Sequence, residues 1–173
     1  MTSQTELPNP NNSSPEPVLP LETVPFPIKL FASGLFSGFS PVATGTVGSA
    51  VGLLLYFIPG FEHPYVIMPA CFLVLLLGIK AADRMEKVYG HDPAEVTIDE
   101  VLGMWVSLLF LPKTLLVAAV AFFVFRILDI IKPFPAKKFD AQHGGFGIMF
   151  DDVVAATYTN LLVQILVKTG LIF

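Results

Sequence analysis

Residues 64–79 read PYVIMPACFLVLLLGI and contain no charged side chain. Four further uncharged, apolar runs occupy residues 46–59, 101–112, 114–125 and 153–167. A helix needs about 20 apolar residues to cross a hydrocarbon core of about 30 Å. Runs of this length therefore predict an all-α, polytopic membrane bundle of about five short, partly re-entrant or shallow helices. A soluble bundle with buried core helices is the alternative, but five such runs leave little polar face for water.

The composition of the 173-residue chain favours the membrane class. Hydrophobic residues make up 54 % and charged residues 14 %, whereas a soluble domain carries roughly 25 % charged residues. The net charge of −4 indicates no basic surface, so we expect no nucleic-acid partner. The single cysteine, Cys71, excludes an intramolecular disulfide and a thiolate zinc cluster. Its apolar surroundings make it a poor nucleophile.

The first 28 residues differ in character from the rest. They hold seven of the fifteen prolines, separated by Asn, Ser and Thr, and they show no helical or strand period. We predict a disordered tail over residues 1–28 and a membrane-embedded domain over residues 29–173. The tail lacks the basic start and apolar run of a secretory signal.

The basic residues predict an orientation in the membrane. If the chain leaves the tail on the cytoplasmic side and crosses five times, only Lys113 and Lys168 fall outside. The other eight basic residues then lie inside: Lys29, Lys80, Arg84, Lys87, Arg126, Lys132, Lys137 and Lys138. This asymmetry is what the positive-inside rule expects. The turns at residues 59–64 and 111–114 would then be outer turns.

Carboxylates gather at one membrane level in this topology. Asp99 and Glu100 open the third apolar segment, Asp129 ends the fourth, and Asp151 and Asp152 open the fifth. Ionisable groups at the edges of apolar helices are costly and are functional candidates. Clustered anions repel one another unless a cation binds among them, and oxygen ligands suit Mg²⁺ first and Mn²⁺ or Ca²⁺ after it.

Structural roles are the alternative for these carboxylates. The doublets at residues 99–100 and 151–152 could simply cap helix N-termini, and Asp129 could form an i,i+3 ion pair with Arg126. Glycines four residues apart, such as Gly48 and Gly52, are typical of closely packed membrane helices and carry no chemistry.

Two further stretches could bind an anion. Residues 40–49, SPVATGTVGS, place Ser40, Thr46 and Ser49 at the start of an apolar helix, where free N–H groups attract anions. A capped, glycine-packed helix explains the same pattern. His143 begins the stretch HGGFGIM, whose glycines predict a loop that brings the backbone close to a ligand. His143 could bind phosphate or relay a proton. It could equally be a surface histidine.

The end of the fourth apolar segment is a further candidate site for binding an anion. Arg126, Asp129 and Lys132 lie at steps of three, which predicts one helical face before Pro133 ends the helix. Two cations around one carboxylate suit a site where phosphate and metal meet. An interfacial helix end with snorkelling side chains is the alternative.

Four stretches of the chain resemble motifs of the phosphatidylglycerophosphatase A family and occur in the same order as in that family. They are residues 40–49, 99–105 (DEVLGMW), 125–135 (FRILDIIKPFP) and 143–155 (HGGFGIMFDDVVA). The resemblance runs from about residue 29 to the C-terminus. It implies a bacterial inner-membrane enzyme of phospholipid synthesis, with its active site facing the cytoplasm. Such enzymes remove the terminal phosphate of phosphatidylglycerophosphate, giving phosphatidylglycerol, and need Mg²⁺.

We therefore expect direct, metal-assisted hydrolysis of a lipid substrate drawn from the bilayer. One or two Mg²⁺ ions would be held by the five carboxylates, and metal-bound water would be activated. Arg126 and Lys132 would neutralise the phosphate, and Ser40, Thr46, Ser49 and His143 are candidates to bind its other oxygens. One carboxylate could instead act as a general base, or form a covalent aspartyl-phosphate.

Two other functions fit the sequence less well. A small transporter or channel could use carboxylates as a cation path, but it would place them within the spans rather than at their ends. A non-catalytic membrane scaffold would use the doublets only as caps.

Overall fold

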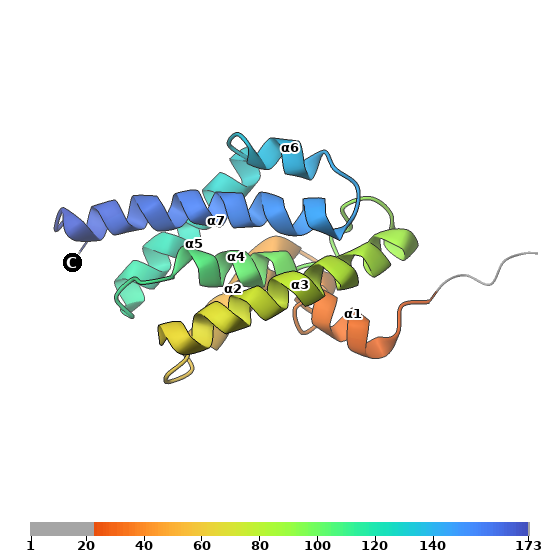
Figure 1. Ribbon diagram of the computed structural model, residues 1–173, viewed down its shortest axis with the longest axis horizontal. Coiled ribbons are helices and arrows are strands. Elements are labelled where there is room, and N and C mark those ends of the chain that lie inside the picture. Colours follow the sequence, from red (N-terminus) through yellow and green to blue (C-terminus); the bar gives the residue numbers. More distant parts are fainter. Residues whose placement is uncertain (1–22, 173) are drawn as a thin grey trace, which may run out of the picture.

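The computed structural model describes residues 23–172, and within this range it contains only helices, turns and loops (Figure 1). The predicted all-α class is confirmed. Seven α-helices and one 3₁₀ helix follow one another along the described chain: α1 (Phe26–Ala32), η1 (Ser37–Phe39), α2 (Thr44–Tyr56), α3 (Pro64–Tyr89), α4 (Ile98–Ser107), α5 (Leu115–Ile131), α6 (Ala136–Asp140) and α7 (Gly145–Lys168).

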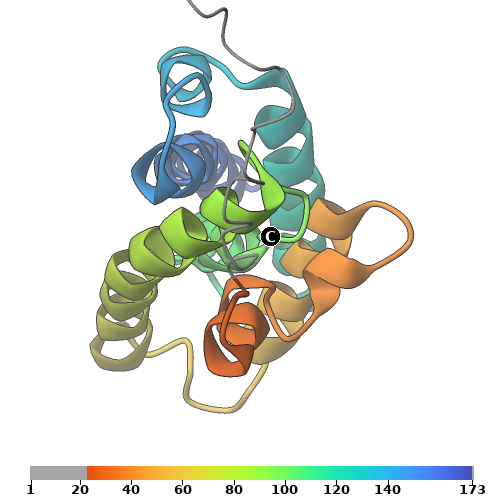
Figure 2. The ribbon, with the colours of Figure 1, turned by 90° about the vertical axis from the view of Figure 1, so that its right-hand side faces the viewer.

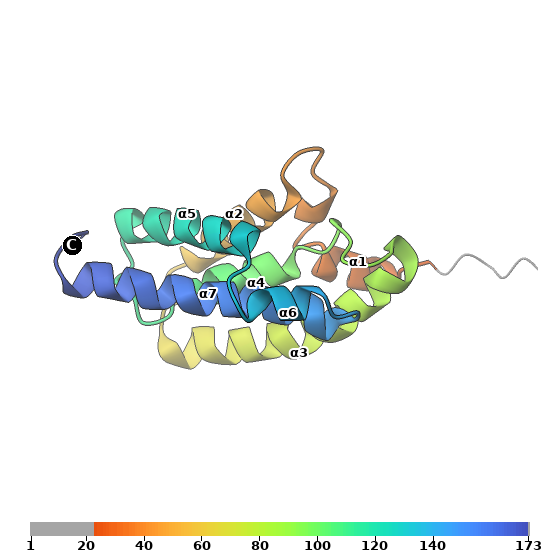
Figure 3. The same ribbon diagram turned by 90° about the horizontal axis from the view of Figure 1, so that it is seen from above.

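The short helix α4 lies at the centre of the bundle. Eight of its ten residues are buried, and it packs against α2, α3, α5 and α7. Figure 3 shows α5 and α7 running lengthwise beside each other over this core. The apolar run at residues 101–112 therefore corresponds to a helix enclosed by protein and a turn after it, rather than to a span that faces lipid.

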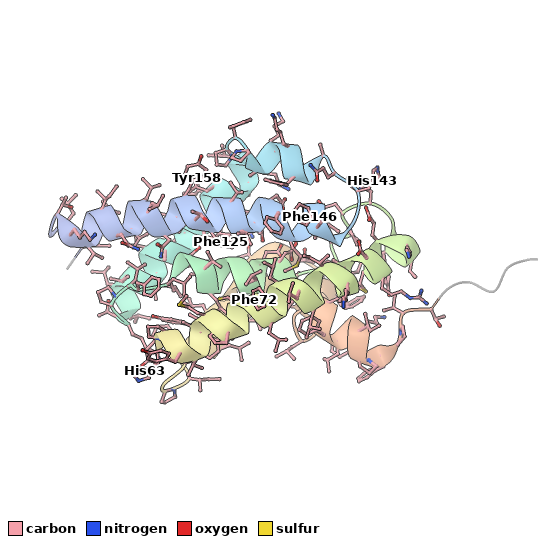
Figure 4. All side chains as sticks on the ribbon, in the orientation of Figure 1. His63, Phe72, Phe125, His143, Phe146 and Tyr158 are labelled. Atoms are coloured by element: carbon pink, nitrogen blue, oxygen red, sulfur yellow. The ribbon has the colours of Figure 1, made fainter. Side chains whose placement is uncertain are left out.

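Two described helices, α3 and α7, are long and apolar enough to cross a membrane. The outward face of α3 carries large apolar side chains such as Phe72, which is 64 % exposed (Figure 4). Helix α2 is apolar but has only 13 residues, or about 20 Å at 1.5 Å per residue. Long and short helices are thus combined in one bundle. Helices α3 and α7 extend well beyond the short apolar runs at residues 64–79 and 153–167.

The two turns predicted to lie on the outer side meet at one end of the bundle. Lys113 follows α4, and its Nζ donates to Oε2 of Glu62 at 2.6 Å and to the carbonyl of Ile58 at 2.9 Å. Both acceptors belong to the turn between α2 and α3. Figure 2 views the bundle from the opposite end, where α3 finishes and α7 begins. The membrane side that each end faces remains a prediction.

Helix α1 corrects one predicted boundary. It begins at Phe26, inside the segment predicted as a disordered tail, whose first 22 residues lie outside the described range. Pro25 and Pro27 read as helix breakers, but they occupy the N-cap and the first turn, where the missing N–H costs no helical hydrogen bond. Helix α1 then supports α4, because the carbonyl of Ala32 accepts from the N–H of Thr97 at 3.0 Å.

Close packing between α2 and α4 depends on two glycines. A Cβ added to Gly48 would lie 2.8 Å from Cβ of Thr97, and one added to Gly52 would lie 3.0 Å from Cα of Val101. The carbonyl of Gly52 also accepts from Nε1 of Trp105 at 2.9 Å. The small residues at four-residue spacing therefore bring the backbone of α2 against α4.

We predict that Gly52→Val destabilises the fold by about 1–3 kcal/mol, because the new side chain overlaps the backbone of α4. The measurement is unfolding in detergent with increasing SDS. Leu54→Val is the matched control, since it introduces the same residue on the exposed face of α2. Equal stability of the two variants would contradict the close packing described here.

Candidate functional site

Three carboxylates converge between α4 and α7. One carboxylate oxygen from each of Asp99, Glu100 and Asp152 lies within 4.8 Å of the others. Asp99 and Glu100 occupy the first turn of α4, and Asp152 is the eighth residue of α7. Asp99 is 8 % exposed and Asp152 is 3 % exposed. The site is therefore a buried group of acidic oxygens contributed by two packed helices.

Arg126 and Asp129 of α5 form the second part of the site. Their ion pair, Nη1 to Oδ2, is 2.9 Å long, so the expected i,i+3 contact is confirmed. Nη1 of Arg126 also donates to Oγ of Ser49 at 3.4 Å. A Cβ on Gly45 would collide with Glu100 and Arg126, so this glycine lets both reach the start of α2.

Lys132 forms the third part, in a position that the sequence pattern did not predict. Helix α5 ends at Ile131, and Lys132 is its C-cap in the left-handed conformation, with φ of 48°. Its Nζ therefore turns away from the helix, donates to Oδ2 of Asp151 at 2.6 Å and makes a second ion pair with Asp140. Burial alone would lower the pKa of Lys132, but the hydrogen bonds to Asp140 and Asp151 raise it above the ordinary value.

The contact with Asp140 was missed at the sequence level. Eight residues separate Lys132 from Asp140, and the chain between them passes Pro133 and Pro135 before entering α6. No helical spacing relates the two side chains, so only the turn in three dimensions brings them together.

The second carboxylate doublet does not open α7. That helix begins at Gly145, so Asp151 and Asp152 lie in its second and third turns, and the N-terminal cap alternative is wrong for them. The glycines of the HGGFGIM stretch suggested a loop. Gly145 and Gly147 are instead helical. They are glycines because the start of α7 packs against the carbonyls of Ile79 and Gln142, where a Cβ would not fit.

The predicted phosphate-binding residues fall into two groups. Ser49 is fully buried beside Arg126. Thr46 is exposed on α2, and Ser40 is half-buried in the loop before it, where its Oγ donates to the carbonyl of Val42 at 2.9 Å. His143 has an 80 % exposed side chain, with Nδ1 3.3 Å from Oε1 of Glu86. The structure therefore places Ser49 in the buried site and the other three outside it.

The site holds more carboxyl groups than its two cations can pair. Five carboxylates, at residues 99, 100, 129, 151 and 152, share the two cations Arg126 and Lys132. Among the described residues, Oε2 of Glu100, Oδ2 of Asp152 and Nε of Arg126 are buried without a hydrogen-bond partner. Buried polar atoms without partners are costly. Unsatisfied carboxylate oxygens in an oxygen-only donor set fit a hard divalent cation.

We predict that Lys132→Met lowers the stability of the folded protein by about 1–3 kcal/mol, because it leaves Asp151 without its cation. Adding Asp151→Asn should restore most of that loss, since the neutral amide needs no counter-charge. Unfolding in detergent measures both variants, with Lys137→Met as an exposed-lysine control. Additive losses in the double variant would show that the two side chains do not interact.

Comparison with known proteins identifies this arrangement. The family model for phosphatidylglycerophosphatase A matches residues 30–167. Phosphatidylglycerophosphatase A of Escherichia coli is 39 % identical over 136 residues, covering 75 % of this chain and 77 % of that protein. The Haemophilus influenzae protein of the same name is 36 % identical over 144 residues, covering 79 % and 86 %.

A protein of Bacteroides thetaiotaomicron that is provisionally named a phosphatidylinositol-3-phosphatase is also 36 % identical over 144 residues, covering 79 % of this chain and 91 % of that protein. No solved structure matches. The family match spans most of the chain and all four motifs that carried the resemblance. The chain therefore belongs to the phosphatidylglycerophosphatase A family, and it is a phosphatase.

Proposed function

We propose that this phosphatase hydrolyses phosphatidylglycerophosphate to phosphatidylglycerol and inorganic phosphate, with Mg²⁺ as its cofactor. The observation that carries the proposal is the buried group of carboxylates beside Arg126 and Lys132. Two relatives are named for this activity. An anionic protein site acting on an anionic headgroup needs a cation to offset the repulsion between them.

Asp99, Glu100 and Asp152 would hold the metal, because their oxygens converge and two of them lack partners. A bound Mg²⁺ supplies Lewis-acid polarisation of the phosphoryl group and lowers the pKa of a coordinated water. The oxygen-only donor set favours Mg²⁺ over metals that prefer nitrogen or sulfur.

The other charged residues of the site would bind the phosphate and move a proton. Arg126 has a buried Nε–H without a partner, which can donate to a phosphate oxygen. Lys132 offers a compact positive charge beside Asp151, the neighbour of Asp152 in the doublet on α7. Asp129 and Asp151 lie beside the three converging carboxylates, where either can accept the proton of the attacking water.

The position of the site suits a substrate that stays in the membrane. It lies toward the end of the bundle where α3 finishes and α7 begins, between helices whose outer faces are apolar. The acyl chains can remain beside those faces while the phosphate enters the polar site. We propose that this end faces the cytoplasm of a bacterial inner membrane, because eight of the ten basic residues then lie inside.

A second substrate has one specific observation in its favour. The relative from Bacteroides thetaiotaomicron is named for a phosphate on inositol rather than on glycerol. Both lipids present a phosphomonoester on a diacylglycerol-linked headgroup, so the buried site could act on either. The rates of phosphate release from the two lipids distinguish these two activities.

We predict that the purified protein releases phosphate from phosphatidylglycerophosphate in Mg²⁺ and that EDTA abolishes the release. Phosphatidylinositol 3-phosphate, phosphatidic acid and soluble glycerol 3-phosphate serve as comparison substrates, measured by released phosphate in mixed micelles. Faster release from phosphatidylinositol 3-phosphate would replace the proposed substrate. Full activity in EDTA after metal removal would contradict the cofactor.

We also predict that Asp99→Asn and Asp152→Asn each lower turnover at least ~100-fold, because each removes a charged metal ligand. Both variants should remain folded, since an amide of the same size replaces the carboxylate. Glu62→Gln is the control, because it neutralises a carboxylate at the opposite end of the bundle. Near-normal turnover in both aspartate variants would contradict the site assignment.

A further inference from the structure

A second group of potential ligands lies apart from the carboxylate site. Glu86 belongs to the last turn of α3, His91 to the loop after it, and His143 to the loop before α7. Figure 4 shows His143 at this end of the bundle and His63 at the other. One ligand atom from each of Glu86, His91 and His143 lies within 4.8 Å of the others.

The two histidines direct the same atom toward the same oxygen. Nδ1 of His91 is 2.8 Å from Oε1 of Glu86, and Nδ1 of His143 is 3.3 Å from that oxygen. The two imidazole rings lie side by side, with centroids 4.1 Å apart. Ligands at 2.0–2.1 Å around a tetrahedral zinc ion are separated by roughly 3.4 Å. The 3.3 Å separation from Oε1 to His143 matches this spacing. The 2.8 Å separation to His91 is a hydrogen-bond distance, which a bound ion would lengthen by about 0.6 Å.

The carboxylate at the centre of this group is held in place. Oε2 of Glu86 accepts from the N–H of Gly144 at 2.7 Å, which leaves Oε1 turned toward the two rings. Hydrogen bonds of this kind orient metal ligands in proteins. The Glu86 side chain is 14 % exposed, whereas the histidine side chains are 40 % and 80 % exposed. A metal ion could therefore enter from solvent onto a preformed carboxylate.

We propose that Glu86, His91 and His143 bind Zn²⁺, or a divalent metal of similar preference, at a site separate from the carboxylate cluster. Two imidazole nitrogens and one carboxylate oxygen are a donor set that suits zinc rather than Mg²⁺. Three protein ligands leave a fourth position for water. The ion joins the end of α3 to the loop that leads into α7, the helix that carries Asp151 and Asp152.

Metal binding itself is the test, so its outcome does not depend on the proposed lipid activity. The full chain is purified without a histidine tag, stripped with a chelator, and saturated with Mg²⁺ to occupy the oxygen-rich site. Zn²⁺ is then titrated by calorimetry, and Co²⁺ is titrated by visible absorption, whose intensity distinguishes a tetrahedral site from an octahedral oxygen site. The variants are His91→Ala, His143→Ala and His143→Asn, with His63→Ala as the matched control.

The expected result is one Zn²⁺ per chain in the wild-type protein and in His63→Ala. Each His91 or His143 variant should bind at least ~10-fold more weakly, and Asp152→Asn should bind as tightly as the wild type. Equal affinity in all variants, or no Zn²⁺ binding by the folded wild-type protein, would overturn the proposal. The three side chains would then serve only as a hydrogen-bonded link between α3 and α7.

Discussion

The burial of negative charge at the start of α4 is the constraint on which the rest of the bundle depends. Asp99 and Glu100 enter the protein interior on a helix that other helices surround, and Asp152 meets them there. Buried charges need partners, because removal from water costs several kcal/mol for each ion. Arg126 of α5 lies near Glu100, and Lys132, in the turn after α5, pairs with the neighbouring Asp151. Helices α4, α5 and α7 must therefore meet at one point.

The packing of α2 against α4 leaves room for these side chains. Gly45, Gly48 and Gly52 line one side of α2, and each lies where a Cβ would touch the start of α4, its backbone or a charged side chain of the site. On the opposite side of α4, the ring of Phe125 fills the space at Gly103. The small residues therefore do more than permit dense packing, because Gly45 also leaves the space at the start of α2 into which Glu100 and Arg126 extend.

Much of this arrangement could be predicted from local sequence patterns. The apolar runs, the carboxylates at their edges and the pair of Arg126 with Asp129 depend on residues close in sequence, so helical periodicity was enough to find them. The ion pairs of Lys132 could not be found this way. Lys132 is the C-cap of α5 in the left-handed conformation. Its partners therefore depend on the positions of α6 and α7 in three dimensions.

The start of α7 shows a different limit of sequence interpretation. Glycine is a poor helix former, so HGGFGIM predicted a loop. Tertiary packing overrides that preference, because Gly145 and Gly147 are the residues that allow the helix start to approach α3 and the end of α6. Likewise, the run at residues 101–112 was counted among the predicted membrane helices, but apolar side chains look the same in sequence whether lipid or protein surrounds them.

The depth of the site limits the room available to α4. Asp152 is the eighth residue of α7, which places it about 10 Å along the helix from Gly145 at 1.5 Å per residue. Asp99 is the second residue of α4 and lies in the same group of carboxylates. Helix α4 must therefore begin level with the third turn of α7, well inside the end of the bundle. A helix that starts at this depth has less than the length of a full membrane span left before the opposite end of the bundle, so a short α4 is compatible with a recessed group of carboxylates.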